Sequence, residues 1–222
     1  MRKDSKKLVI NGVILAGGKA RRLGGLVKGC IEIGRNVSIV EQLINELKNA
    51  GINNIVIAAN DSTPYLHLDV EVLPDIREGI GPIGGIETGL VHFADKADAV
   101  MFVPCDMPNI TSKEMLTLIE AFKKTEKPVV FAHTAGFFLH PLCAVVHNHL
   151  KNQISSAIDN GQLKVQDIWQ QLDAEAVPFD DESAFFNINN FEDMHKWVKE
   201  YRNEKENMSR KFDSTKTPGV PR

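Results

Sequence analysis

Short apolar segments alternate with helix-period segments along the chain, and this order constrains the fold more than any other feature of the sequence. Each apolar segment is continuously hydrophobic and rich in β-branched residues, which is the pattern of strands covered on both faces. Alternating strands and helices predict right-handed crossovers and an α/β fold, a doubly wound and mostly parallel sheet with helices on both faces. The predicted strands are Asn11–Ala16, Asn53–Asn60, Val70–Leu73, Asp98–Asp106 and Lys127–His133.

Two amphipathic helices are predicted between these strands. Residues 111–125 open with Thr111 and Glu114, which have the spacing of a capping box. Residues 37–51 end at Gly51, a typical C-terminal stop. Their apolar face consists of Val40, Leu43, Ile44 and Leu47.

The second half of the chain is less regular. We expect a strand at His140–His147, a helical region at Asn148–Leu172 that breaks near Gly161, a strand at Ala174–Phe179, and a closing helix at Phe191–Tyr201. These elements complete one domain over residues 1–202, within the usual size of a single domain. Residues 203–222 are polar and lack periodicity, so we expect a disordered tail there.

Composition excludes several classes of protein. A net charge of −3 argues against binding a nucleic acid polymer, which needs a broad basic footprint. Cys30, Cys105 and Cys143 are far apart and form no Cys-x-x-Cys pair, so neither a disulfide framework nor a structural zinc site is indicated. The N-terminus lacks a signal-peptide pattern, and no apolar run approaches membrane-spanning length. We therefore expect a cytoplasmic protein.

A glycine-rich turn with clustered positive charge follows the first predicted strand. Gly17 and Gly18 let backbone N–H groups approach an oxyanion, and we expect the next helix to present its positive end there. This turn is either a phosphate site or a strand-to-helix turn with solvated basic residues, and the density of cations favours phosphate. The cations are Lys19, Arg21, Arg22 and Lys28.

A second candidate site lies at the end of the most apolar strand, in the segment Val103–Pro108. Asp106 follows this strand and faces the same crevice as the first turn, because parallel sheets bind ligands beyond the carboxyl ends of their strands. Its carboxylate is suited to Mg²⁺, a hard cation that takes few protein oxygens. The alternative is an Asp that caps the turn before Pro108. Cys105 has no evident base beside it, so we interpret it as a small buried residue and not as a nucleophile.

Two further strand ends carry polar side chains. Asn60 and Asp75 are either turn formers or groups that hydrogen-bond a nucleotide base or ribose. Between Gly79 and Gly89 lies a second glycine-rich loop before a helix, in which Gly81, Pro82 and Gly85 are candidates for the wall of a site. Any one of these glycines is equally well explained by a turn of positive φ.

The segment before the closing helix has a pair of amides. Asn187 and Asn189 are two residues apart, so in an extended segment both face the same side. Asn190 is placed to cap the helix that follows, and turn and capping chemistry is the plain alternative for all three. His147 and His149 form a His-x-His without a supporting cluster of carboxylates, and they fit a solvated helix start better than a metal site.

The order and content of these motifs resemble the molybdenum cofactor guanylyltransferases, a family of nucleotidyltransferases that attach GMP to molybdopterin using Mg-GTP. The resemblance covers nearly all of residues 8–200. It is carried by L-A-G-G-x-x-x-R-x-G-G-x-x-K-G at Leu15–Gly29, P-C-D-x-P at Pro104–Pro108, the G-P-containing loop and the N-x-N pair. The chain departs from the family at Val27, where an Asp is usual, which puts the placement of Lys28 in question.

The resemblance implies a role for each matched position. Arg22 and Lys28 would stabilise the leaving pyrophosphate and Asp106 would anchor Mg²⁺, while the Asn187–Asn189 pair and the His140–Pro141 dipeptide would lie on the molybdopterin side. The nucleotide would be contacted by Leu15, Ala16, Gly17, Gly18, Asn60 and Asp75. The reaction implied is in-line attack of the terminal phosphate of molybdopterin on the α-phosphorus of GTP.

Two other readings remain open from the sequence. One is a related nucleotidyltransferase that uses CTP or activates a sugar or alcohol phosphate. The other is a nucleotide-binding protein of the same fold without activity, which Val27 favours and the intact Lys28 and Asp106 disfavour. The family resemblance also implies transient contacts with proteins that supply or receive the cofactor.

Overall fold

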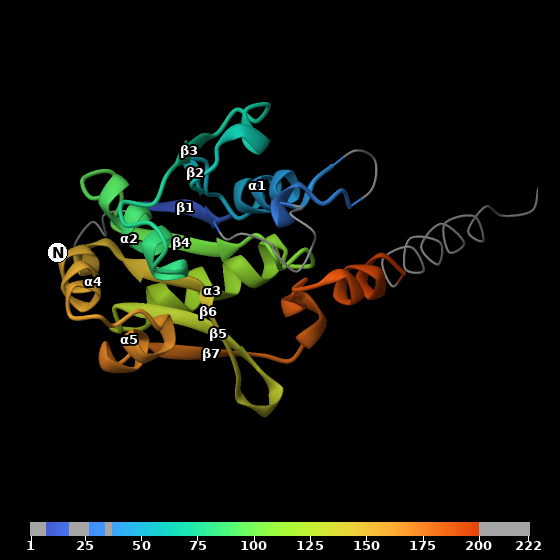
Figure 1. Ribbon diagram of the computed structural model, residues 1–222. Helices are drawn as coiled ribbons and strands as arrows, with labels where there is room; N and C mark the ends of the chain where they lie inside the picture. The colour runs from blue at the N-terminus through green and yellow to red at the C-terminus, as the bar shows by residue number, and fades with distance from the viewer. Residues whose placement is uncertain (1–7, 18–26, 34–36, 200–222) are drawn as a thin grey trace, which may run out of the picture.

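The computed structural model describes residues 8–17, 27–33 and 37–199 (Figure 1). Their strands form one seven-stranded sheet in the order β3-β2-β1-β4-β6-β5-β7. The strands are β1 (Ile10–Leu15), β2 (Ile55–Ala58), β3 (Glu71–Leu73), β4 (Ala99–Pro104), β5 (Val129–Thr134), β6 (Phe138–His147) and β7 (Glu175–Phe179).

The sheet is mostly parallel, as the strand–helix alternation predicts. Strands β3, β2, β1 and β4 are parallel neighbours, and β7 is parallel to β5. Strand β6 runs antiparallel to both β4 and β5. The chain leaves β1 toward β2 on one side and returns to β4 on the other, so the strand order reverses between β1 and β4. Open α/β sheets bind ligands at such a reversal, beyond the carboxyl ends of the strands.

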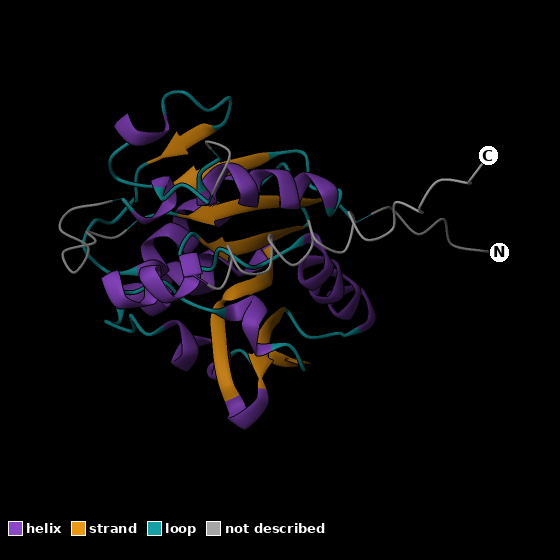
Figure 2. Cartoon of the chain, turned by 90° about the vertical axis from the view of Figure 1, so that its right-hand side faces the viewer, coloured by secondary structure: helices purple, strands orange, loops and turns teal. Residues whose placement is uncertain are grey.

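Helices cover both faces of the sheet (Figures 1 and 2). One face packs against α1 (Ile39–Asn49), α3 (Ser112–Lys124) and the helical residues 191–199. The other packs against α2 (Pro82–His92), α4 (Lys151–Asp159) and α5 (Val165–Gln171). Short 3-10 turns connect them: η2 (Lys28–Cys30), η3 (Thr63–Tyr65), η4 (Ala135–Phe137), η5 (Asn148–Leu150) and η6 (Glu182–Phe185).

The core therefore has two halves separated by the sheet. Adjacent residues of β1 belong to different halves: Val13 packs under α2, and Ile14 packs under α1. This alternation follows from the two-residue period of a strand and explains why the strands are apolar throughout. The two edge strands depart from this pattern, since Glu71 of β3 and Ala176 of β7 are exposed.

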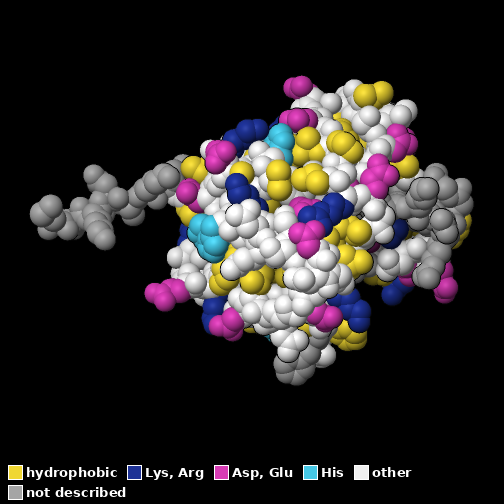
Figure 3. Space-filling view, turned by 60° about the vertical axis from the view of Figure 1, so that its left-hand side comes forward, with side chains coloured by type: hydrophobic (Ala, Val, Ile, Leu, Met, Phe, Trp, Pro, Cys, Tyr) yellow, Lys and Arg dark blue, Asp and Glu magenta, His cyan; other side chains and the backbone are white. Residues whose placement is uncertain are grey.

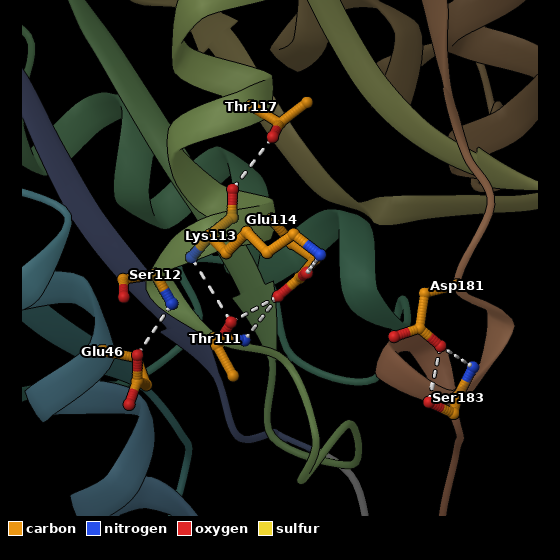
Figure 4. Close-up of polar contacts among 8 residues, drawn as sticks. All are labelled: Glu46, Thr111, Ser112, Lys113, Glu114, Thr117, Asp181 and Ser183. Atoms are coloured by element: carbon orange, nitrogen blue, oxygen red, sulfur yellow. Dashed lines mark hydrogen bonds and ion pairs between the residues drawn. The ribbon is translucent and has the colours of Figure 1, made fainter.

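The predicted helix boundaries are largely confirmed. Thr111 and Glu114 form the capping box of α3, in which Glu114 Oε2 accepts hydrogen bonds from the Thr111 N–H and hydroxyl at 3.1 and 2.6 Å (Figure 4). Helix α1 has a capping box of its own at Ser38 and Glu41, which was not predicted from the sequence. Beyond α1, Gly51 has a φ of +86°, a conformation that glycine adopts without strain.

The surface is mixed in charge. On the face shown in Figure 3, the side on which α2 and α4 lie, basic and acidic side chains are interspersed with hydrophobic ones. Within the described ranges, no helix combines the length and the hydrophobicity that crossing a bilayer demands.

Candidate active site

The carboxyl ends of the four parallel strands β3, β2, β1 and β4 lie side by side at one end of the sheet. Backbone hydrogen bonds continue the ladder past the strand ends, from Cys105 N to Leu15 O at 3.0 Å and from Ala16 N to Ala58 O at 3.0 Å. The next bond, from Ala59 N to Leu73 O, extends this alignment to β3. The residues that follow these ends are therefore held side by side, and four of the predicted site residues are among them: Gly17, Asn60, Asp75 and Asp106.

A lysine, a carboxylate and an amide converge at the end of β4. Lys28 Nζ lies 3.2 Å from Asp106 Oδ2 and 3.3 Å from Asn189 Oδ1. The side chains of Lys28 and Asp106 are 21% and 26% exposed, so both are partly shielded and still reachable from solvent. The backbone fixes this arrangement, because Ile188 N donates to Asp106 O at 2.9 Å and so holds the C-terminal segment beside the end of β4.

Close packing of η2 places Lys28. Its neighbour Gly29 is buried, and a Cβ there would lie 2.5 Å from Val40 Cγ2 and 2.9 Å from Tyr65 Oη. Glycine thus lets η2 lie directly against α1 and η3. Val27 is partly buried and packs against the same core, so the residue that departs from the family pattern has an apolar role.

Tyr65 belongs to the support of this site and was not identified from the sequence. It is 1% exposed, and burial is the main cause that raises the pKa of its hydroxyl far above the ordinary value. The phenol is therefore neutral, and its hydroxyl has no hydrogen-bond partner among the described residues. A lone tyrosine in a polar segment carries no pattern that would indicate such a position.

Asn60 and Asp75 form a reciprocal pair at the ends of β2 and β3. Asn60 Nδ2 donates to Asp75 Oδ2 at 3.1 Å, and Asp75 N donates to Asn60 Oδ1 at 2.7 Å. Partial burial raises the pKa of the Asp75 carboxyl, the hydrogen bond from Asn60 opposes this, and the nearby Glu78 adds to the rise. Gly17 borders the pair, since a Cβ there would lie 3.9 Å from Asp75 Oδ2.

The expected second glycine-rich loop is mostly helix, because α2 begins at Pro82 and only residues 79–81 form the turn before it. Gly79 and Gly81 have φ values of +78° and +80°, so here the explanation by turn geometry holds. Gly85 serves close packing instead, because a Cβ there would lie 2.9 Å from Leu15 Cδ2 and 3.3 Å from the Ala58 Cβ. The N-terminal half of α2 therefore lies against the crevice.

The two amides of the C-terminal segment differ in their contacts. The Asn189 side chain reaches Lys28, whereas Asn187 Nδ2 donates to Phe185 O at 3.3 Å within its own segment. Asn190 caps the closing helix as expected, since its Oδ1 accepts from Asp193 N at 2.9 Å.

Neither the cysteine nor the histidines form a nucleophilic site. Burial and the neighbouring Asp106 raise the pKa of Cys105 to about 12, so its thiol is protonated and unreactive at neutral pH.

His140 stacks on Phe185 with ring centroids 4.7 Å apart, and its Nε2 forms a hydrogen bond with Thr134 Oγ1 at 3.1 Å. Burial lowers its pKa, so this ring is neutral at pH 7.

The oxygen donors of the crevice fit a hard cation. The described residues include no cluster of three His, Cys, Asp or Glu side chains able to hold a metal by themselves. A cation such as Mg²⁺ needs only one or two carboxylates when phosphates supply further ligands. Asp106 Oδ2, with Asn189 Oδ1 near the same lysine, provides that kind of donor set.

Several predicted residues lie outside the described residues. These are Gly18, Lys19, Arg21 and Arg22, all in the segment between residues 17 and 27. The α-helix described next after the first turn is α1, which begins at Ile39 and is capped by Ser38. A helix N-terminus directly at the turn is therefore not part of what the structure describes.

A separate groove of about 650 Å³ lies between α3 and β7. None of the predicted site residues lines it. Its lining consists of Leu116, Thr117, Glu120, Ala121, Lys124, Thr125, Glu175 and Val177.

A family model and several curated relatives match most of this chain. Residues 12–176 match the family model of the MobA-like NTP transferase domain. A molybdenum cofactor guanylyltransferase of Mannheimia succiniciproducens is 34% identical over 85% of this chain and 98% of its own length. Another, from Aliivibrio salmonicida, is 30% identical over 84% of this chain and 94% of its own.

Solved structures show the same fold. Molybdopterin-guanine dinucleotide biosynthesis protein A from Archaeoglobus fulgidus superimposes with a TM-score of 0.70 at 22% identity, covering 87% of this chain and 99% of that one. A CMP:2-keto-3-deoxy-manno-octonic acid synthetase complexed with CTP superimposes with a TM-score of 0.69 at 12% identity, covering 88% and 99%.

Proposed function

Since the chain belongs to the family of MobA-like NTP transferase domains and is a nucleotidyltransferase, we propose that it transfers GMP from GTP to molybdopterin. In this reaction an oxygen of the terminal phosphate of molybdopterin forms a bond to the α-phosphorus of GTP. The bond from that phosphorus to the oxygen bridging the β-phosphate breaks, and pyrophosphate leaves. The product is the guanine dinucleotide form of the cofactor.

The contact between Lys28 and Asp106 is the observation that carries the proposal. Its 3.2 Å ion pair lies at the strand-order reversal, where this type of sheet binds nucleotides. A carboxylate and an ammonium group held together suit a metal–triphosphate complex, which presents both positive and negative charge. Such a site acts by positioning its reactants and by stabilising charge, so it needs no protein nucleophile.

Each side chain of the crevice then has a distinct task. Asp106 would hold a divalent cation, which we propose to be Mg²⁺ and which supplies charge neutralisation at the phosphates when bound. Lys28 would donate to the phosphate oxygens on which charge develops as pyrophosphate leaves. Asn189 orients the Lys28 ammonium, and we place molybdopterin on this side of the crevice. Arg22 is assigned by family resemblance to the same charge stabilisation.

The base and the ribose would occupy the other end of the crevice, at Asn60 and Asp75. Asp75 accepts hydrogen bonds, and the N1–H and 2-amino group of guanine are donors on one edge of the base. Asn60 holds the Asp75 carboxylate in place by the reciprocal bonds described above. Gly17 and the backbone of Leu15 and Ala16 would pass close to the nucleotide.

Transfer assays on Asp106 variants test this proposal. With Mg²⁺, GTP and molybdopterin, we expect the wild type to release pyrophosphate and form the dinucleotide. Asp106→Asn keeps the shape of the side chain and removes its charge, so we expect a loss on the order of 100-fold or more in kcat. The matched control is Asp95→Asn, an exposed carboxylate in the connection from α2 to the amino end of β4, which should behave as wild type. Equal background rates in the wild type and Asp106→Asn would refute the proposal.

Base choice is tested in the same assay. CTP and ATP should not form the pair of hydrogen bonds to Asp75, because neither base presents the two adjacent donors of guanine. Faster turnover with CTP would assign the chain to a related reaction.

A further inference from the structure

The segment that carries Asp75 is fastened to α2 at successive residues. It connects β3 to α2 and covers residues 74–81. Besides the pairing of Asp75 with Asn60, Ile76 N donates to Thr88 Oγ1 at 2.9 Å. The next residue, Arg77, reaches a buried carboxylate in the middle of α2.

That carboxylate is Glu87, whose side chain is only 3% exposed. Its Oε1 accepts a hydrogen bond from Ser155 Oγ of α4 at 2.7 Å. Its Oε2 has no hydrogen-bond donor among the described residues and lies 3.2 Å from Arg77 Nε, an ion pair without hydrogen-bond alignment. A buried carboxylate is strongly unfavourable without a compensating charge, so Glu87 depends on Arg77.

The second contact of Arg77 is more exposed to solvent. Its Nη1 donates to Asp159 Oδ1 at 2.6 Å, but the Asp159 side chain is 65% exposed. Exposed ion pairs of this kind contribute little because water screens them. The ion pair with Glu87 is therefore the contact of Arg77 that is shielded from water.

Close packing transmits the position of Arg77 to Asp75. A Cβ at Gly84 of α2 would lie 3.0 Å from Arg77 O and 3.4 Å from Asp75 Cγ. The backbone of residues 75–77 thus lies directly on the helix surface, and only two peptide units separate the Arg77 anchor from the Asp75 carboxylate. A shift of Arg77 would move this carboxylate.

We propose that Arg77, through its ion pair with buried Glu87, is a positioning residue that holds Asp75 in register for the nucleotide base and thereby sets base selectivity. This inference rests on the proposed reading of guanine by Asp75. Arg77 itself does not contact the ligand, because its side chain points to α2 and α4. Its contribution is to fix the direction of a hydrogen-bond acceptor, and discrimination between bases depends on such hydrogen bonds.

The test compares GTP with inosine triphosphate (ITP), which differs from GTP only by lacking the 2-amino group. The wild type should prefer GTP by about tenfold to a hundredfold in kcat/KM, the worth of one hydrogen bond to a charged acceptor. In Arg77→Gln we expect this ratio to fall to within about threefold of unity, with KM for GTP raised about tenfold and KM for molybdopterin unchanged. Arg77→Lys, which keeps the charge, should restore part of the ratio.

Two further variants separate positioning from folding. Arg77→Gln combined with Glu87→Gln removes both charges, so no uncompensated buried carboxylate remains, and this double variant should fold and still lose selectivity. Asp159→Asn removes only the exposed contact and should keep the wild-type ratio within about twofold.

The outcomes distinguish this inference from the function on which it rests. If Asp75→Asn abolishes the preference for GTP while folded Arg77→Gln and the double variant retain it, Arg77 has no positioning role and the function stands. If Asp75→Asn retains the preference for GTP, Asp75 does not bind the base. The base-binding role of Asp75 and the positioning role of Arg77 then both fail. Should transfer to molybdopterin be absent in the wild type, the ratio of dissociation constants for GTP and ITP, measured by titration calorimetry, decides the same question.

Discussion

Gly29 lies beside Lys28 in η2, where a side chain would collide with its neighbours. The nearest atoms to a Cβ at this position are Val40 Cγ2 of α1 and Tyr65 Oη of η3. Neither can withdraw freely, because both side chains are buried. The position of the Lys28 ammonium relative to Asp106 is therefore set by the absence of a side chain one residue later.

Replacing this glycine should uncouple Lys28 from Asp106. We expect Gly29→Ala to lower the free energy of unfolding by about 1–3 kcal/mol, the usual cost of overpacking a core, and to reduce the transfer rate. Urea unfolding with a transfer assay measures both effects. In a double-mutant cycle, Val40→Ala should relieve part of the collision and give a coupling of at least about 0.5 kcal/mol. Unchanged stability in Gly29→Ala would contradict this role.

The candidate residues at the strand ends were predicted from the sequence, whereas the residues that support them were not. Lys28 and Asp106 are 78 positions apart, and their convergence was predicted because both follow parallel strands of one sheet. Arg77 and Glu87 were missed, since a loop arginine and a helical glutamate have no characteristic spacing. The different contacts of Asn187 and Asn189 were also beyond the sequence, because an alternation rule assumes a regular extended chain.

At the scale of elements, local signals define where the helices begin. The capping box of α3 satisfies backbone N–H groups that have no partner inside the helix. Glu46 of α1 adds to this by accepting from Ser112 N at 2.7 Å, which ties the start of α3 to its neighbour (Figure 4). Glycines define other boundaries, at Gly51 after α1 and at Gly161 between α4 and α5.

The cap should be measurable against a control in the same helix. We expect Thr111→Ala to lower the free energy of unfolding by about 1 kcal/mol, the usual value of an N-cap. Thr117→Ala removes a hydroxyl that donates to Lys113 O within the helix, and it should change stability by less than about 0.5 kcal/mol because alanine has the higher helix propensity. Equal losses of unfolding free energy in the two variants would show that the N-cap contributes no more to stability than the hydroxyl of Thr117. Thermal or urea unfolding of both proteins provides the comparison.

At the scale of the whole molecule, the α/β class and the mostly parallel sheet followed from the strand pattern. The antiparallel direction of strand β6 could not be predicted, because an apolar segment gives no indication of the direction in which the strand runs. The edge position of β3 was likewise hidden, since neighbours in a sheet are not encoded in the strand itself. What the pattern does specify is the location of the crevice, because any sheet of this type exposes the carboxyl ends of β1 and β4 together.

The most direct test of the account is a crystal structure with GTP and Mg²⁺ bound. We predict a metal ion at Asp106 and triphosphate oxygens within hydrogen-bonding distance of Lys28, with the guanine edge against Asp75. A nucleotide bound elsewhere, for example in the groove between α3 and β7, or a metal remote from Asp106, would contradict the central claim that these strand ends form one nucleotide site.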